Sequence, residues 1–294
     1  MAMSALSWQY CVVMNSARDF VELLTLEPLG ADVYRGTCHS GSPMRAFGGQ
    51  VAAQSLIAAG HTVGEERVAH SLHGYFIRGG RTDQPIEYHV DRTRDGGSFT
   101  TRRVTAEQDG KAIFSLSASF QVPEAGTDHQ PTMPQVPRPE ELTADKHKWT
   151  AWFDDEPPVP ALVLDLRFVG DSTVGLPDVG NGPRQRFWVR VRDDLPDESL
   201  LHTCALTYIS DVNLVRTVNL TRGTSSTPRQ VASLDHAVWL HRPFRADEWL
   251  LFTQEVPNAS GGRGLARGQI YSEDGVLVAS VMQEALLRDT PPSA

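Results

Sequence analysis

The amino-acid sequence predicts an α+β protein built from two similar halves, each with one long buried helix followed by an antiparallel sheet. Three observations lead to this prediction. Strand-like segments with alternating apolar and polar residues occur in both halves. A helix-like segment precedes the strands in each half, with Gln50 of the first matching Asp211 of the second. Asp-Gly turn signals recur at residues 109 and 274, so we interpret the chain as a long-period duplication.

The first half is expected over residues 16–126, where a short amphipathic helix opens the chain. The segment 47–63 begins with Gly48-Gly49 and is small or apolar on nearly all sides, which is typical of a buried helix. Strand-like runs follow at residues 70–78, 86–94, 98–108 and 112–122. In the last run the apolar residues recur with period 2, as in a half-buried antiparallel strand. Asp109-Gly110 before it is typical of a type I′ hairpin turn.

The second half is expected over residues 161–289 and repeats this plan. A helix-like segment at 207–219 is followed by strand-like runs at 232–241, 248–256, 264–273 and 276–288. The glycine-rich stretch Gly261–Gly268 lies between two of these runs and opens no helix, so it predicts a hairpin loop, not a nucleotide loop.

A proline-rich linker is expected at residues 127–160, between the two halves. Prolines at this density interrupt helices and strands alike and favour an extended connector. Trp149, Trp152 and Phe153 inside it predict a short docked helix.

Composition excludes several classes of protein. The formal net charge is −9, whereas a dedicated nucleic-acid binder is expected to be basic. No apolar run approaches the roughly 20 residues that a membrane helix needs, so we expect no membrane insertion. The three cysteines show no metal-ligand spacing, and their odd number favours a reducing, cytoplasmic setting. The chain contains no GxSxG, HExxH, P-loop or EF-hand motif, and we expect neither a metal nor an organic cofactor.

A set of short motifs carries a family resemblance that covers about residues 18–288. They are FGGQVAAQSL, HSLHGYF, RDGGSFTTRRV, ASFQ, TYISDVNL, ASLDHAVWLHRPF, EWLL and DGVLVASVMQE. In this order, across both halves, they resemble the acyl-CoA thioesterase II family, the TesB type. The resemblance implies a tandem, or double, hotdog fold. It also implies hydrolysis of medium- to long-chain acyl-CoA to free fatty acid and CoA.

The resemblance further implies a catalytic trio of Asp, Thr or Ser, and Gln that positions a water molecule. Carried over motif by motif, the trio is Asp211, Ser233 and Gln283. The residues agree with this. Asp211 falls on the predicted buried helix, where a carboxylate is costly unless it is hydrogen-bonded. Gln283 is a polar amide in an inward apolar row of the last strand, and a buried amide needs partners. The corresponding first-half residues, Gln50, His70 and Ala118, lack this chemistry, which predicts one active centre per chain.

A direct-water mechanism follows from these residue types. Asp211 would act as general base, and Ser233 and Gln283 would hold the water in attack geometry. Backbone N–H groups near the glycine-rich helix start would stabilise the oxyanion. Nucleophilic attack by Ser233 is the competing route. Strand alternation places His236 on the opposite face from Ser233, which argues against that route.

Two other functions stay open on sequence alone. A hotdog hydratase would need a helix Asp with a partner His, and it would leave Gln283 without a role. A non-catalytic acyl-CoA-binding protein could keep the fold and lose the trio, but all three positions are present here. We also expect a homo-oligomer, because hotdog sheets present open edges and broad faces. Arg78, Arg81, Arg242, Arg263 and Arg267 lie near predicted strand ends and could meet the phosphates of CoA.

Overall fold

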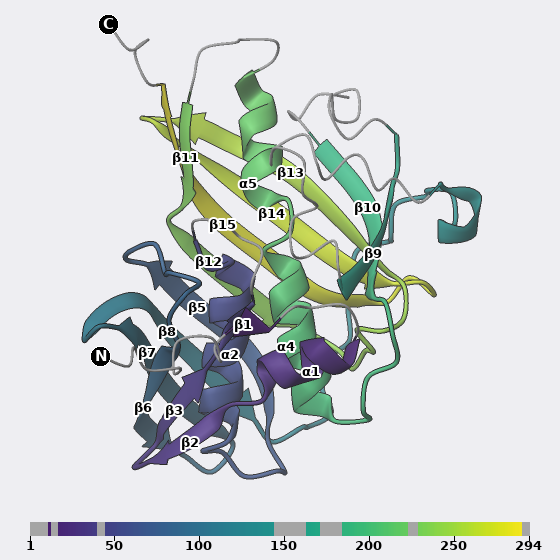
Figure 1. Ribbon diagram of the computed structural model, residues 1–294. Coiled ribbons are helices and arrows are strands. Elements are labelled where there is room, and N and C mark those ends of the chain that lie inside the picture. The colour runs from purple at the N-terminus through teal and green to yellow at the C-terminus, as the bar shows by residue number, and fades with distance from the viewer. Residues whose placement is uncertain are drawn as a thin grey trace, which may run out of the picture.

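The computed structural model describes residues 11–12, 17–39, 45–143, 163–170, 184–222 and 229–289. The expected helix around Trp149, Trp152 and Phe153 lies outside these residues. In Figure 1 the strands of the first half lie in the lower part of the view and those of the second half in the upper part, while α4 (Ser199–Ser210) of the second half reaches down beside α2 (Gly48–Gly60).

The first half contains two helices and eight strands among the described residues. These are β1 (Cys11–Val12), α1 (Ala17–Leu24), β2 (Glu27–Gly30), β3 (Val33–Gly36), β4 (Cys38–His39), α2 (Gly48–Gly60), β5 (Val68–Phe76), β6 (Ile86–Asp95), β7 (Phe99–Gln108) and β8 (Lys111–Gln121).

The second half, with the segment that leads to it, follows the same plan. Its described elements are η1 (Pro139–Glu141), β9 (Leu164–Phe168), β10 (Arg184–Val191), α4 (Ser199–Ser210), α5 (Leu214–Asn219), η4 (Leu220–Arg222), β11 (Arg229–Ser233), β12 (Asp235–Leu240), β13 (Leu250–Ser260), β14 (Arg263–Ser272) and β15 (Leu277–Asp289).

One continuous sheet runs through both halves. Among the described residues its strand order is β2-β3-β6-β7-β8-β5-β12-β15-β14-β13-β10-β9, and β11 also pairs with β15. The two halves join where β5 and β12 pair antiparallel, with Leu72 opposite Val238. The edge strand of each half is therefore covered by the other half at this seam.

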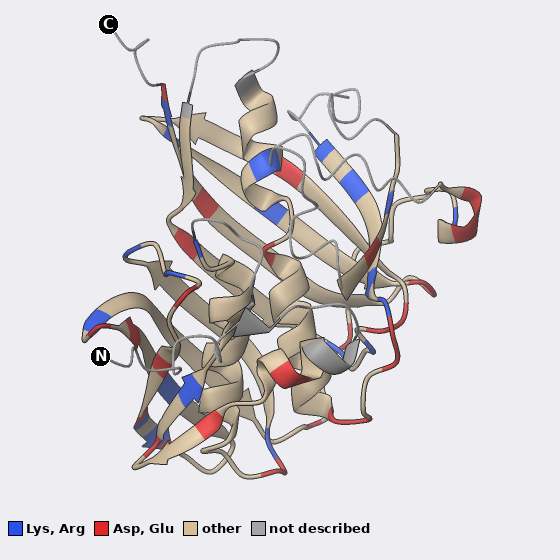
Figure 2. Ribbon diagram, viewed as in Figure 1, with Lys and Arg blue, Asp and Glu red and all other residues tan. Residues whose placement is uncertain are grey.

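The first central helix is confirmed as a buried one. Every residue of α2 from Gly49 to Ala59 is buried, and the helix contacts β6, β7 and β8 as well as α4. Neither α2 nor α4 contains a charged residue, and both appear almost free of charge colours in Figure 2. Most of the buried side chains of α2 are apolar, and the buried polar ones, Gln50, Gln54 and Ser55, are hydrogen-bonded within the first half.

The second central helix differs from the sequence prediction. The expected single helix at 207–219 is interrupted at 211–213, and α4 instead extends back to Ser199. Asn213 adopts a left-handed conformation with φ 67°, which asparagine tolerates better than most residues. The resulting turn lifts Asp211 out of the helix and places it between α4 and α5.

The hairpin predictions are confirmed in position. Asp109 and Gly110 both have positive φ, 50° and 66°, as a type I′ turn requires. Gly261 and Gly262 likewise form the turn between β13 and β14. At the turn between β14 and β15 only Gly275 has positive φ, so that turn belongs to a different type.

The described part of the expected linker packs against the outer face of the second half. The indole of Trp188 donates a hydrogen bond to the Pro137 carbonyl at 2.9 Å. Gln130 donates to the Gly275 carbonyl and accepts from the Leu277 N–H. The segment lacks helix and strand up to η1, but these contacts fix its path.

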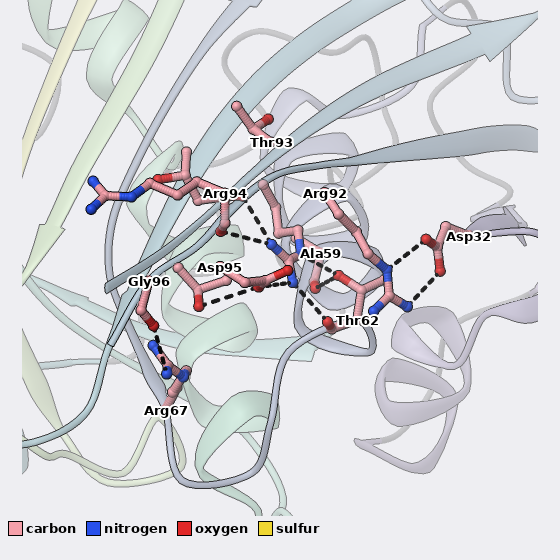
Figure 3. Close-up of polar contacts among 12 residues, drawn as sticks. Asp32, Ala59, Thr62, Arg67, Arg92, Thr93, Arg94, Asp95 and Gly96 are labelled. Atoms are coloured by element: carbon pink, nitrogen blue, oxygen red, sulfur yellow. Dashed lines mark hydrogen bonds and ion pairs between the residues drawn. The ribbon is translucent and has the colours of Figure 1, made fainter. Parts of the chain in front are cut away.

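A buried arginine fixes the far end of α2. Arg102 of β7 is 1% exposed and donates to both the hydroxyl and the carbonyl of Thr62, just after the helix. It also bonds to Asp95 at 2.6 Å, and Figure 3 shows Thr62 and Asp95 drawn together in this network. A cation at a helix C-terminus is favoured by the helix dipole. The opposite end of α2 is the one that meets the candidate site.

Candidate active site

The candidate site begins at the glycine-rich start of α2. The Gly49 N–H donates a hydrogen bond to Asp211 Oδ2 at 2.8 Å, across the boundary between the halves. A Cβ atom on Gly48 would lie 2.8 Å from the same oxygen, and one on Gly49 would lie 2.5 Å from the Tyr208 carbonyl. The two glycines therefore allow the turn between α4 and α5 to approach the helix start this closely.

Asp211 is a buried carboxyl group, only 9% exposed. Its Oδ1 has no hydrogen-bond partner among the described residues. Burial raises the pKa of Asp211 to about 7, and hydrogen bonding from the Gln283 side chain and the Gly49 N–H opposes the rise. A carboxylate with a pKa near neutrality and a free oxygen is suited to accept a proton.

The structure brings Gln283 and Ser233 into direct contact. Gln283 is 1% exposed on β15, and its Nε2 donates to Ser233 Oγ at 2.6 Å. The Gln283 side chain also lowers the pKa of Asp211, so the amide lies near enough to act on the carboxyl group. All three residues that the sequence predicts thus converge on one place, and their catalytic roles stay a prediction.

A β-bulge corrects the expected orientation of His236. Ser233 pairs with Ala285 of β15, whereas Ala237 pairs with Met282, so one extra residue lies on the β11–β12 side. Leu234, between the two strands, donates to the Glu284 carbonyl and accepts from the Phe76 N–H. A bulge of one residue reverses the alternation that follows it. The prediction that His236 faces away from Ser233 is therefore wrong, and both side chains lie on the face of Gln283.

His236 is the residue that sequence reasoning missed. It is fully buried, with Nδ1 2.8 Å from Gln283 Oε1 and Nε2 2.7 Å from Ser210 Oγ. Burial lowers its pKa to about 4, so the imidazole is neutral near pH 7. Both ring nitrogens are already engaged, which leaves neither available as a base for Ser233. Its sequence signal is a histidine directly before the apolar run Ala237–Leu240.

The first half carries a similar bulge without the polar residues. In β5 the register against β8 shifts by one residue between Ala69 and Ser71. The strand pairing therefore matches Ser233 with Ala69, not with His70 as the sequence alignment suggested. His236 and Gln283 correspond to Leu72 and Ala118, which pair with each other. His70 instead bonds to Ser119.

The other first-half residue, Gln50, also lies away from the carboxyl group. Its amide donates to the Thr37 carbonyl and to Gln54, inside the first half. Among the described residues, no group of three His, Cys, Asp or Glu side chains could hold a metal ion.

Most of the candidate phosphate-binding arginines are paired with carboxylates. Arg81 pairs with Asp83, and Arg242 with Asp128. Arg263 and Arg267 pair with Glu284 and Glu255. Arg78, two residues beyond Phe76 of β5, donates to the Ala112 carbonyl. Of the five, it alone shows no carboxylate partner among the described residues.

Comparisons with known proteins agree with this architecture. The family model described as acyl-CoA thioesterase matches residues 177–286, and the one described as acyl-CoA thioesterase N-terminal domain matches residues 39–121. The crystal structure of an acyl-CoA thioesterase II, TesB2, from Mycobacterium marinum superposes with a TM-score of 0.79 at 44% identity, covering 92% of this chain and 99% of that one. A protein with a hot dog fold from Alicyclobacillus acidocaldarius, 21% identical with a TM-score of 0.72, covers 92% of this chain and 98% of its own. The predicted double hotdog fold is therefore confirmed.

Curated relatives define the family. Acyl-coenzyme A thioesterase 8 of Rattus norvegicus is 39% identical over 284 residues, which are 92% of this chain and 88% of the relative. Acyl-CoA thioesterase 2 of Haemophilus influenzae is 37% identical over 281 residues, covering 92% and 97%. The chain belongs to the acyl-CoA thioesterases, a family of thioester hydrolases. No helix among the described residues is long and apolar enough to cross a membrane.

Proposed function

We propose that this protein hydrolyses medium- to long-chain acyl-CoA to free fatty acid and CoA by direct attack of water. The observation that carries the proposal is the Asp211 carboxyl group, which is buried, has a pKa of about 7 and keeps one oxygen unpartnered beside Gln283. The family membership supports the substrate class. A thioester carbonyl is electrophilic enough for a positioned water to attack without a covalent intermediate.

The proposed roles follow from the hydrogen bonds. Asp211 takes a proton from the water while the water oxygen attacks the thioester carbonyl carbon. Ser233 and Gln283 orient that water, and holding it in place supplies part of the rate enhancement. When the tetrahedral intermediate collapses, the C–S bond breaks and the proton returns from Asp211 to the CoA sulfur. Asp211 thus returns the proton that it took up, and the proposed reaction needs neither a metal nor an organic cofactor.

The oxyanion requires a donor other than the Gly49 N–H. That group already donates to Asp211 Oδ2. Its hydrogen bond favours the ionised carboxylate, so the start of α2 supports the base directly. The sequence expectation that N–H groups at this helix start serve the oxyanion does not hold for Gly49.

The alternatives fit the geometry less well. A hotdog hydratase would need a histidine working with the helix aspartate, but His236 bonds to Gln283 and Ser210. A non-catalytic acyl-CoA-binding protein would have no use for a buried carboxyl group with a free oxygen, which costs stability.

A free-thiol release assay across acyl-CoAs of increasing chain length tests the function. Release of CoA, greatest with medium and long chains, is the expected result. Tight binding of acyl-CoA without release would support the binding-protein alternative. With an enoyl-CoA as substrate, loss of the double bond without release of thiol would support a hydratase.

We further propose a cytoplasmic homo-oligomer that acts in fatty acid metabolism. Tyr75 and Ile77 lie near the end of β5, and their side chains are 68% and 47% exposed. An interface between copies of the chain would remove this apolar surface from water. Sedimentation at micromolar concentration should give a species larger than the 32.3 kDa chain. A single species of that mass would contradict the oligomer.

A further inference from the structure

The Gln283 carboxamide lies in the middle of a continuous line of hydrogen bonds. Ser210 Oγ is 2.7 Å from His236 Nε2, and His236 Nδ1 is 2.8 Å from Gln283 Oε1. Gln283 Nε2 is 2.6 Å from Ser233 Oγ. The four side chains come from α4, β12, β15 and β11, so separate elements must assemble to form the line.

With the Gln283 carboxamide oriented as in the structure, the chemistry of the groups gives this line one direction. A carboxamide oxygen can only accept, so His236 Nδ1 must carry the proton that it shares with Gln283. Because burial keeps the imidazole neutral, Nε2 is then an acceptor and must receive the hydroxyl proton of Ser210. In this orientation hydrogen bonds run from Ser210 to His236, then to Gln283, then to Ser233. The Ser210 hydroxyl has one proton, so it then gives up its hydrogen bond to the Thr207 carbonyl.

The reverse direction would also satisfy every group in the line. Ser233 would donate to a flipped Gln283, which would donate to His236 Nδ1, and Nε2 would donate to Ser210. Ser210 would in turn donate to the Thr207 carbonyl, 2.7 Å away. The flip would turn the carboxamide oxygen toward Ser233 and the Asp211 carboxyl group. An ionised carboxylate needs donors, so it favours the direction in which the NH₂ group faces it.

We propose that His236, held by Ser210, is a positioning residue that fixes the Gln283 carboxamide with its NH₂ group toward Ser233 and Asp211. The inference rests on the proposed function of the trio. The first half of the chain offers an internal comparison, because Leu72 and Ala118 occupy the positions of His236 and Gln283. Where the amide is absent, the histidine is absent too.

Two substitutions of His236 test the donor. His236→Leu removes the Nδ1–H and introduces the residue that the fold already accepts at position 72. We expect kcat to fall about 10²-fold, as for a misplaced reacting group, with KM nearly unchanged. His236→Asn can present an amide N–H near the position of Nδ1 and should recover most of that loss. The matched control is His70→Leu, which breaks a similar histidine–serine contact in the first half and should leave kcat unchanged.

A double-mutant cycle separates positioning from a structural role. In a Gln283→Ala background, His236→Leu should cause little further loss of kcat, because the amide that it orients is gone. An equal loss in both backgrounds would overturn the inference. So would full kcat in His236→Leu when Gln283→Ala is impaired. Full activity in Gln283→Ala would instead reject the proposed function, and the inference with it.

The tautomer of His236 gives a further test, which is measured on the histidine itself and not on His236→Leu. Nitrogen-15 spectra of histidine-labelled protein near pH 7, assigned with His236→Asn, should show a neutral ring protonated at Nδ1. Protonation at Nε2 would mean that the line runs in reverse, with the amide oxygen toward Ser233, and would overturn the inference.

Discussion

The Gly49 N–H and Asp211 Oδ2 are 2.8 Å apart, although 162 residues separate them in the chain. The donor belongs to the first half and the acceptor to the second. The hydrogen bond stabilises the ionised carboxylate against a burial that favours the protonated form. The candidate base therefore depends on a residue of the half that contributes none of the three candidate catalytic side chains.

Adding a methyl group at Gly48 should displace that base. In Gly48→Ala the new Cβ would lie 2.8 Å from both Asp211 Oδ2 and Phe76 Cζ, closer than real contacts allow. We expect kcat to fall about 10²-fold, since small displacements at a reacting centre are costly. Gly97→Ala is the control, because nothing lies within 4 Å of its Cβ position. Wild-type kcat in Gly48→Ala would show that Asp211 does not need this approach.

Removing the charge of Asp211 should remove most of the activity. Asp211→Asn keeps the shape, and turnover should fall by roughly 10²–10⁴, the usual contribution of a positioned base. Adding Gln283→Ala should make little further difference, because residues that act as a unit are non-additive. Steady-state kinetics with a long-chain acyl-CoA measure both variants. Gln50→Ala should change stability more than kcat, since that amide bonds within the first half.

The pH dependence of the wild type should follow Asp211. Its pKa is raised to about 7, so the carboxylate that accepts the proton is depleted below that value. We expect kcat/KM to rise with pH and level off above about 7, with roughly tenfold loss per pH unit below it. A profile that is flat between pH 5 and 8 would exclude Asp211 as the titrating base.

The Asp211 carboxyl group should also lower the free energy of unfolding as pH rises. Because the pKa of Asp211 in the folded protein lies above its ordinary value of 3.8, the folded state stays protonated up to a higher pH than the unfolded state does. The free energy of unfolding should therefore fall between about pH 4 and pH 7. Asp211→Asn removes this dependence and should stabilise the protein by a few kcal/mol, in order of magnitude, at pH 8. Urea unfolding of both proteins at pH 5 and pH 8 measures the difference, and an equal difference at both pH values would contradict it.

Ser233 should act by hydrogen-bonding the attacking water and not as a nucleophile. Ser233→Ala should impair turnover, because Gln283 and the water lose a partner. Ser233→Thr should be nearly silent, since it keeps the hydroxyl. Mass spectrometry of the enzyme during turnover should find no acyl group on Ser233. An acyl-enzyme at that residue would reject the direct-water mechanism.

The general plan of the fold was predictable from local sequence. The uncharged sequence of α2 indicated burial, and period 2 in the last strand of each half indicated an antiparallel sheet. These features depend on which residues face water, and a short window of sequence contains that information. The types of the three candidate site residues were also visible, although only the family motifs singled them out.

The details that arrange the site were not predictable in this way. The bulge at Leu234 depends on hydrogen bonds to Glu284 and Phe76, in two different neighbouring strands. The break in the helix at Asp211 occurs where the start of α2 approaches the turn, and that approach depends on two glycines in the other half. Both are long-range effects, which strand and helix periodicity do not record.

The sharing of the site between the halves bears on how a duplicated gene evolves. In the first half, Ala69, Leu72 and Ala118 occupy the positions of Ser233, His236 and Gln283. Deleting the first half would remove the Gly49 N–H from Asp211 and the β5 edge from β12. Under the roles proposed for the trio, selection would keep both halves although only one carries the three side chains.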